Sequence, residues 1–290
     1  MTGGPLTDRV AIVTGAGRGI GRSIALFLAR DGARVVLAAR TGAELDETMV
    51  ACGRPEGDVL TVVTDISDPT QADNLIAAAL DEMGHVDALV NSAGVYGPIG
   101  STAEVDVAAW ARAVEINLMG PLYLCRAVMP HMMERGSGKI VLLGGGGATA
   151  PLPFFSAYAA SKAGVARLAE TLAGELEPHN VQVNVVAPGL VDTTLQDDVL
   201  AAGDKAGPLL EKIAAARETG AGAVSPDVAA ELVAFLVSEA SGALTGKLIA
   251  APHDPWREWG ERSEQLNGTP MYTLRRLDPY TITPLIEELP

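Results

Sequence analysis

The sequence contains only two cysteines, Cys52 and Cys125, and it has no CxxC pair or Cys/His cluster. Two cysteines so far apart cannot provide the framework of a disulfide-rich domain, and a structural zinc site needs closely spaced ligands. We therefore expect two reduced thiols that pack as small apolar side chains, no metal site and a cytoplasmic location.

Basic residues and long apolar runs are also scarce. The chain has 21 Lys and Arg residues against 36 Asp and Glu residues, a net charge of −15. This charge disfavours binding to nucleic acid or to an anionic membrane surface. No run of roughly 18 apolar residues spans a membrane, and the N-terminus lacks the pattern of a signal peptide. We predict a soluble protein without nucleic-acid or membrane partners.

Short β-branched segments alternate with longer alanine-rich helical segments along most of the chain. The expected strands lie near residues 9–15, 33–40, 58–65, 86–94, 138–145, 181–189 and 247–251. Their consecutive apolar residues are typical of strands buried on both faces of a parallel sheet. We therefore predict an α/β fold, a Rossmann-type doubly wound parallel sheet in three α/β/α layers, over residues 1–252.

The composition changes after residue 252. Residues 253–290 contain no alanine, five prolines and four of the twelve aromatic residues, namely Trp256, Trp259, Tyr272 and Tyr280. We interpret this segment as a C-terminal extension that packs on the domain or on a neighbouring subunit. An alternative is that its aromatic start, HDPWREW, borders the active site.

A glycine-rich turn connects the first expected strand to the first helix. It reads TGAGRGIG, with Gly15, Gly19 and Gly21. Glycines here let the backbone approach a pyrophosphate at a helix N-terminus, so the turn predicts a dinucleotide site. Arg18 lies in this turn, and Arg40 follows the second strand where an acid would bind a ribose 2′-hydroxyl. Two guanidinium groups favour a 2′-phosphate, and hence NADP(H) over NAD(H).

Tyr158 and Lys162 form a YxxxK pair in an expected helix after the fifth strand. A spacing of four residues places both side chains on one helix face. An ammonium group nearby favours the phenolate, so we expect Lys162 to lower the pKa of Tyr158 and to make it a general acid or base.

With these motifs in order, residues 6 to 251 resemble the short-chain dehydrogenase/reductase family. The matching segments are TGAGRGIG, Asp65, NSAG at 91–94, Asn117 in INLMG, YAASK at 158–162 and PGLVDTT at 188–194. The resemblance implies hydride transfer between a nicotinamide and a carbonyl or alcohol, with Tyr158, Lys162 and Asn117 as catalytic residues. In it, Asn117 holds a water of a proton relay. The implied cofactor-binding residues are Gly15, Arg18, Gly19, Ile20, Gly21, Arg40, Asp65, Ile66, Asn91, Ala93, Gly94, Tyr158, Lys162, Pro188, Gly189, Val191 and Thr193.

The sequence departs from the family pattern at one catalytic position. The family usually has a serine thirteen residues before the tyrosine, and this position is Gly145, within four glycines at 144–147. Thr149 and Ser156 are the nearest hydroxyl residues. Three readings stay open: a working reductase in which the substrate, the extension or the backbone replaces the serine; non-redox chemistry such as isomerisation or elimination; and an NADP(H)-binding sensor without turnover.

Residues 195–224 follow PGLVDTT, and the resemblance implies that they form a substrate lid, whose glycines permit closure. Tyr96, Phe154, Phe155 and the leucines of this segment suggest an apolar pocket, and no lysine or arginine aims clearly at a substrate anion. We predict a small, neutral, apolar or aromatic ketone or alcohol. Helices with small residues such as Ala163 and Gly164 favour a homodimer or homotetramer.

Overall fold

The computed structural model describes residues 4–276, so the aromatic residue Tyr280 lies outside the described part of the chain. Seven parallel strands form one sheet in the order β3-β2-β1-β4-β5-β6-β7. The strands are β1 (Val10–Thr14), β2 (Arg34–Ala39), β3 (Val59–Val63), β4 (Ala88–Asn91), β5 (Gly138–Leu143), β6 (Val181–Ala187) and β7 (Leu248–Ala250). The reversal of strand order between β1 and β4 creates the crevice where doubly wound folds bind their ligands.

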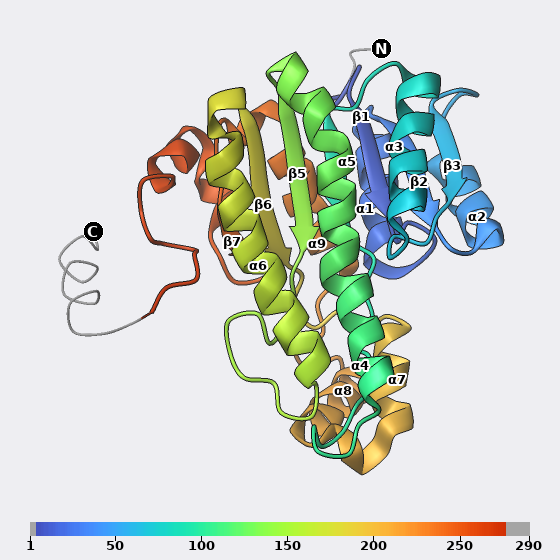
Figure 1. Ribbon diagram of the computed structural model, residues 1–290, viewed down its shortest axis with the longest axis vertical. Coiled ribbons are helices and arrows are strands. Elements are labelled where there is room, and N and C mark those ends of the chain that lie inside the picture. Colours follow the sequence, from blue (N-terminus) through green and yellow to red (C-terminus); the bar gives the residue numbers. More distant parts are fainter. Residues whose placement is uncertain (1–3, 277–290) are drawn as a thin grey trace.

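Helices cover both faces of this sheet (Figure 1). One face carries α1 (Gly19–Arg30), α2 (Gly42–Cys52) and α9 (Pro226–Val237). The other carries α3 (Pro69–Met83), α4 (Val107–Val114), the π-helix η1 (Glu115–Met119), α5 (Gly120–Arg135) and α6 (Ser156–Leu176). Short 3₁₀ turns are η2 (Glu177–His179), η3 (Gly203–Ala206), η4 (Glu239–Ser241), η5 (Trp256–Glu258) and η6 (Gly260–Leu266). These layers confirm the predicted Rossmann-type three-layer architecture.

The strands are hydrophobic on consecutive residues because each side of the sheet faces a separate core. In β1, Ala11 and Val13 pack into the core beneath α1 and α9. Val10 and Ile12 pack into the core beneath α3, α5 and α6. All residues of β1 are buried, as expected for a central strand whose side chains alternate between two covered faces.

The remaining two helices, α7 (Leu195–Ala202) and α8 (Pro208–Thr219), extend beyond the carboxyl ends of the strands, at the bottom of Figure 1. They form the segment predicted as a lid. Most of this segment is regular helix. Val199, Ala206 and Ile213 bury their side chains in a third apolar cluster with Tyr96 and Phe155. The lid therefore has a small core of its own against the domain.

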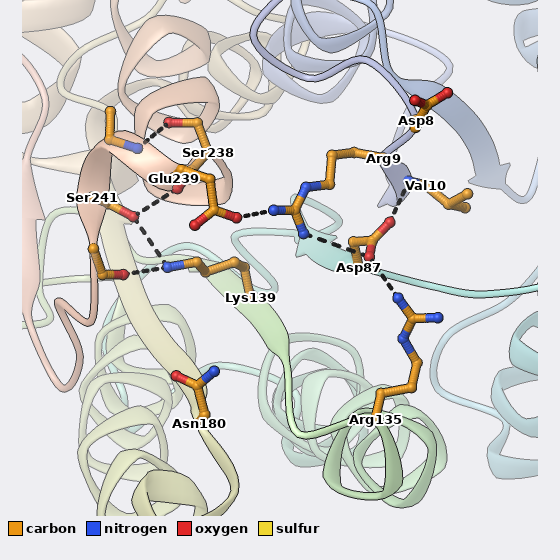
Figure 2. A network of polar contacts seen from close by, with 12 residues as sticks. Asp8, Arg9, Val10, Asp87, Arg135, Lys139, Asn180, Ser238, Glu239 and Ser241 are labelled. Carbon is orange, nitrogen blue, oxygen red and sulfur yellow. Dashed lines mark hydrogen bonds and ion pairs between the residues drawn. The ribbon is translucent and has the colours of Figure 1, made fainter.

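A polar network links the opposite, amino ends of the strands (Figure 2). Asp87, only 5% exposed, accepts a hydrogen bond from the Val10 backbone N–H at 2.8 Å and pairs with Arg135 at 3.2 Å and Arg9 at 3.6 Å. Arg9 also pairs with Glu239 after α9. A buried carboxylate needs such partners, and these arginines join β1, β4, α5 and η4 at the end of the sheet remote from the crevice.

The described part of the C-terminal extension packs on the domain itself. The Leu248 backbone N–H in β7 donates to the Tyr272 carbonyl at 2.7 Å. The buried Lys247 ammonium, 2% exposed, donates to the carbonyls of Thr269 at 2.8 Å and Met271 at 3.1 Å. Trp256 lies 5.8 Å from the ring of Phe235 on α9. The extension is therefore fastened along β7, at one edge of the sheet.

Candidate functional site

The glycine-rich turn lies between β1 and α1, and two of its glycines are required by close backbone approaches. A Cβ on Gly21 would lie 2.2 Å from the Gly15 carbonyl oxygen, and a Cβ on Gly15 would lie 2.8 Å from the Ala93 backbone nitrogen. Gly15 also has φ +66°, a conformation that favours glycine. This packing leaves the N-terminus of α1 open for an anionic group.

A cleft of about 510 Å³ opens over this turn at the carboxyl ends of β1, β2 and β4. Its walls include most of the residues predicted to bind a dinucleotide. They are Gly15, Arg18, Gly19, Ile20, Gly21, Arg40, Asp65, Ile66, Ala93, Gly94 and Thr193. The sequence motifs thus converge on one continuous cleft.

The expected arginines both line this cleft, but an acid accompanies them. The Arg18 guanidinium lies 3.6 Å from the Glu44 carboxylate, and Glu44 lines the cleft as well. The Glu44 side chain also fills the space where a Cβ on Gly17 would lie. Sequence analysis did not single out Glu44, because an acid in the first turn of a helix is common for reasons of the helix dipole alone.

Asp65 lines the cleft and also holds its own turn together. Its carboxylate accepts hydrogen bonds from the Ser67 backbone N–H at 3.0 Å and from Arg112 at 2.8 Å. Partial burial raises the pKa of Asp65, but the hydrogen bonds from Ser67 and the charge of Arg112 outweigh burial and leave the pKa below its usual value. Asp65 therefore stays ionised at the cleft wall.

Asn91 occupies a different place from the one expected. It is buried and absent from the cleft wall, and its side-chain oxygen accepts a hydrogen bond from the Thr14 hydroxyl at 2.6 Å. It thus joins β4 to β1 behind the crevice. The neighbouring residues Ser92, Ala93 and Gly94 form the wall instead.

Tyr158 and Lys162 lie on the same face of α6, as their spacing predicts. The Tyr158 side chain is 8% exposed and packs edge-on against Tyr96, with ring centroids 4.8 Å apart. The buried Lys162 ammonium donates to the Leu143 carbonyl at the end of β5 at 2.7 Å and lies 5.7 Å from the Tyr158 ring centroid. Burial lowers the pKa of Lys162 to about 8.

Lys162 does not lower the pKa of Tyr158 in the way that the sequence had led us to expect. The pKa of Tyr158 is raised above its usual value, mainly by burial and further by the neighbouring Tyr96. The Lys162 ammonium is directed at the Leu143 carbonyl, and desolvation of the phenolate dominates. Tyr158 therefore keeps its proton at neutral pH, which suits a group that donates a proton.

Asn117 lies in the π-helix η1 and is fully buried. Its side-chain NH₂ donates to the Val95 carbonyl at 2.8 Å and to the Ser161 hydroxyl at 3.1 Å. Its side-chain oxygen accepts from the Val95 backbone N–H at 2.9 Å. Both donors of the amide are used within the protein, so the side chain fixes the loop after β4 against α6 and has no N–H left for a water.

Gly145 lies directly against the Tyr158 hydroxyl. A Cβ at this position would lie 2.1 Å from the Tyr158 hydroxyl oxygen and 3.0 Å from Cζ. The Tyr158 hydroxyl therefore occupies the space that any larger residue at 145 would need. Of the two nearby hydroxyl residues, Thr149 lines the cavity described next, whereas Ser156 accepts a hydrogen bond from Trp110 at 3.0 Å.

A second cavity of about 400 Å³ contains the Tyr158 and Lys162 side chains. Other predicted residues on its wall are Ile20, Gly94, Pro188, Gly189, Val191 and Thr193, together with Tyr96. Leucines 152, 190, 195 and 209 supply an apolar lining. Lys212 on α8 also lies on this wall, and the sequence analysis did not single it out because no motif surrounds it. His253 lies there too, and it begins the segment HDPWREW, for which a place at the border of the site was the alternative.

Phe154 and Phe155 do not line this cavity as expected. Phe155 is fully buried and packs against Tyr96, with centroids 5.1 Å apart. Phe154 is partly exposed, has φ +72° and places its ring where a Cβ on Gly207 would lie, at 2.5 Å. Gly207 is the N-cap residue of α8, so the Phe154 ring packs against the start of that lid helix.

Within residues 4–276, every helix is too short or too polar to span a bilayer. Within the same residues, no group of three or more His, Cys, Asp or Glu side chains is arranged to hold a metal ion.

The chain is similar in sequence to proteins of a known family. The family model described as short chain dehydrogenase matches residues 9–203. A dehydrogenase/reductase SDR family member 4 from Homo sapiens is 35% identical over 246 residues, which cover 84% of this chain and 86% of that protein. A cis-4-hydroxycyclohexanecarboxylate dehydrogenase from Sinomonas cyclohexanicum is 37% identical over 253 residues, covering 86% and 96%.

Solved structures with similar folds differ in cofactor. A xylitol dehydrogenase bound to NAD⁺ has a TM-score of 0.77 and 25% identity, covering 84% of this chain and 98% of that one. A variant of actinorhodin polyketide ketoreductase with NADPH has a TM-score of 0.77 and 31% identity, covering 86% and 97%. The comparisons leave both nicotinamide cofactors open.

Proposed function

The chain belongs to the short-chain dehydrogenase/reductase family, and from this premise we propose that it is an NADP(H)-dependent oxidoreductase. Its reaction would move a hydride between the nicotinamide and a carbonyl or secondary alcohol of a small substrate, with Tyr158 as the general acid or base. The bound nicotinamide would supply or accept the hydride.

One observation carries this proposal: the cofactor cleft and the catalytic cavity share a wall. Ile20, Ser92, Gly94, Thr193 and Leu195 line both. A dinucleotide whose pyrophosphate lies on the glycine turn would have its other end at this shared wall, beside the cavity that holds Tyr158. The positions of Gly15 and Gly21, where a Cβ would collide with backbone, fit such a ligand.

Each group of residues around the cavity would have a separate role in the reaction. Tyr158, protonated at neutral pH because it is buried, would donate its proton to a carbonyl oxygen, so reduction is the direction that we favour. Lys162 would bind the nicotinamide ribose while its ammonium stays anchored on the Leu143 carbonyl. Pro188, Gly189, Val191 and Thr193 would contact the carboxamide. The lid would exclude water from the apolar cavity.

The preference for NADP(H) rests on Arg18 and Arg40 at one end of the cleft. Glu44 weakens this argument, because its carboxylate would repel a 2′-phosphate unless Arg18 remains between them. Arg40 forms no ion pair with another described residue and keeps its charge for the ligand. We therefore assign the larger share of 2′-phosphate recognition to Arg40.

The proposal is tested by following NADPH absorbance at 340 nm with a broad panel of ketones. We expect turnover that is lost in Tyr158→Phe, while NADPH fluorescence shows unchanged cofactor binding. Tyr96→Phe is the matched control, since its phenol lies in the same cluster and hydrogen-bonds Gln196 at 3.1 Å. Equal turnover by wild type and Tyr158→Phe would contradict the assigned role. Cofactor binding without turnover of any compound would favour a sensor, and product formation without absorbance change would favour non-redox chemistry.

The remaining parts of the proposal concern organisation. We propose a cofactor-binding domain of residues 1–252 with an extension of 253–290, a homodimer or homotetramer, and a cytoplasmic location. The two unpaired cysteines support a reducing compartment. Gly164 gives the oligomer little support, since a Cβ there would meet Leu118 of the same chain at 3.0 Å. Light scattering after size exclusion tests the assembly directly.

A further inference from the structure

The charges around the catalytic cavity differ from those of the whole chain. The protein has 36 acidic and 21 basic residues. Within the described part of the chain, the cavity wall has no Asp or Glu, but it has Lys162, Lys212 and His253. The neighbouring cofactor cleft is lined by Glu44, Asp65, Asp197 and Asp198. Acidic side chains therefore line the cofactor cleft but not the neighbouring cavity that would hold the substrate.

Of these basic side chains, those of Lys212 and His253 have no hydrogen-bond or ion-pair partner among the described residues, and Lys212 carries the ammonium group. Lys162 is buried and bonded to a carbonyl. Arg217, on the same helix as Lys212, is neutralised by Asp192 at 2.8 Å and Asp197 at 2.7 Å. The Lys212 ammonium forms no hydrogen bond or ion pair with any residue between 4 and 276. An ammonium without a protein partner beside an apolar cavity is available to pair with a ligand anion.

His253 comes to the same cavity from the start of the extension. Its turn is fixed by three contacts: the Ala251 N–H donates to the Ala187 carbonyl at 2.9 Å, Asp254 accepts from the Ala250 N–H at 2.6 Å, and Trp256 donates to the Ala251 carbonyl at 3.0 Å. An imidazole placed in this way has a ring N–H to donate in either protonation state.

We propose that the substrate carries a carboxylate, which Lys212 binds with the help of His253, while the leucine-lined wall holds an apolar skeleton. This inference rests on the proposed function and revises one part of the sequence prediction, the neutrality of the substrate. A carboxylate fits better than a phosphate, because a phosphate carries nearly two negative charges, whereas Lys212 offers one ammonium and the Lys162 ammonium is bonded to the Leu143 carbonyl. The bound anion would also link the lid to the extension across the cavity mouth.

Binding and turnover are tested separately. Calorimetry with NADPH-loaded protein compares benzoate with benzamide, which have nearly the same shape and differ in charge. Kinetics compare 4-acetylbenzoate with 4-acetylbenzamide. We expect the acids to bind and react with about tenfold higher affinity and kcat/KM. The difference should lie mainly in KM, since Lys212 acts on binding.

The variant Lys212→Met should remove this preference, and Lys212→Arg should retain most of it. Lys205→Met is the matched control, because Lys205 also lies on the lid but does not line the cavity. The proposal fails if benzoate and benzamide bind equally to wild type, or if the preference survives in Lys212→Met. If no ketone of either charge is reduced, the proposed function fails, and the calorimetric comparison still decides whether the anion site exists.

Discussion

Replacing Gly145 by serine restores the residue that the family usually has, yet we expect it to harm this protein. The Cβ of serine would lie 2.1 Å from the Tyr158 hydroxyl oxygen, whereas ordinary contacts begin near 3.4 Å. The hydroxyl must therefore retreat by more than an ångström. The ring cannot do so freely, because Tyr96 lies against it with its own hydroxyl bonded to Gln196.

The size of the effect follows from this geometry. Overpacking a well-filled cluster costs about 1–3 kcal/mol of stability, and displacement of a reacting group by about 1 Å costs about 10²-fold in rate. We expect Gly145→Ser and Gly145→Ala to lower kcat by about 10²-fold and to lower the melting temperature by several degrees. Alanine should be as damaging as serine, since the Cβ and not the hydroxyl causes the collision.

The assay measures kcat for NADPH oxidation and the melting temperature of each variant. Gly146→Ser is the control, because a Cβ at Gly146 meets nothing within 4 Å. A rise in kcat in Gly145→Ser would refute the reasoning and would mean that the missing hydroxyl limits the wild-type reaction. Wild-type rate and stability in Gly145→Ala would refute it too.

Three further predictions concern charged groups. Arg40→Ala should lower kcat/KM for NADPH by about tenfold or more and leave NADH little affected, and an equal loss with both cofactors would contradict the assignment. Because burial lowers the pKa of Lys162 from 10.5 to about 8, the unfolded chain holds the proton more tightly. The stability of wild type relative to Lys162→Met should therefore rise by about 2 kcal/mol between pH 8 and 9.5, measured by urea unfolding, and a flat difference would refute this. Burial, helped by the charges of Arg135 and His85, lowers the pKa of His131, whose ring accepts a hydrogen bond from the Val86 N–H at 3.1 Å. Wild type should therefore lose stability relative to His131→Phe as the pH falls through 6.5, and an unchanged difference down to pH 5 would argue against it.

Local motifs predict much of the site because they encode local geometry. The spacing of Gly15 and Gly21 is dictated by one turn, and the spacing of Tyr158 and Lys162 by one turn of helix. Parallel strands then bring both motifs to the same edge of the sheet. These inferences needed no knowledge of tertiary contacts beyond the order of the elements.

The residues that escaped prediction depend on contacts across the fold. Lys212 reaches the cavity from the lid, and no spacing in the sequence links it to Tyr158. The composition of HDPWREW left a place for His253 at the site only as an alternative, because nothing local fixes where the extension packs. The hydrogen-bond partners of Asn117 lie on a loop and on α6. The residue type alone therefore did not reveal that both N–H donors of its side-chain amide are already bonded. The pKa of Tyr158 is raised and not lowered because the side chain is buried, and a sequence motif does not show burial.

The fastening of the extension along β7 also bears on how the chain avoids aggregation through the edge of its sheet. An uncovered edge strand offers unpaired N–H and C=O groups to strands of other molecules. Here the Leu248 N–H donates a hydrogen bond to the Tyr272 carbonyl. The buried Lys247 ammonium donates to two more carbonyls of the same segment. The extension thus protects this border of the sheet, and a chain shortened to residue 252 should aggregate through β7 even where its cofactor cleft is intact.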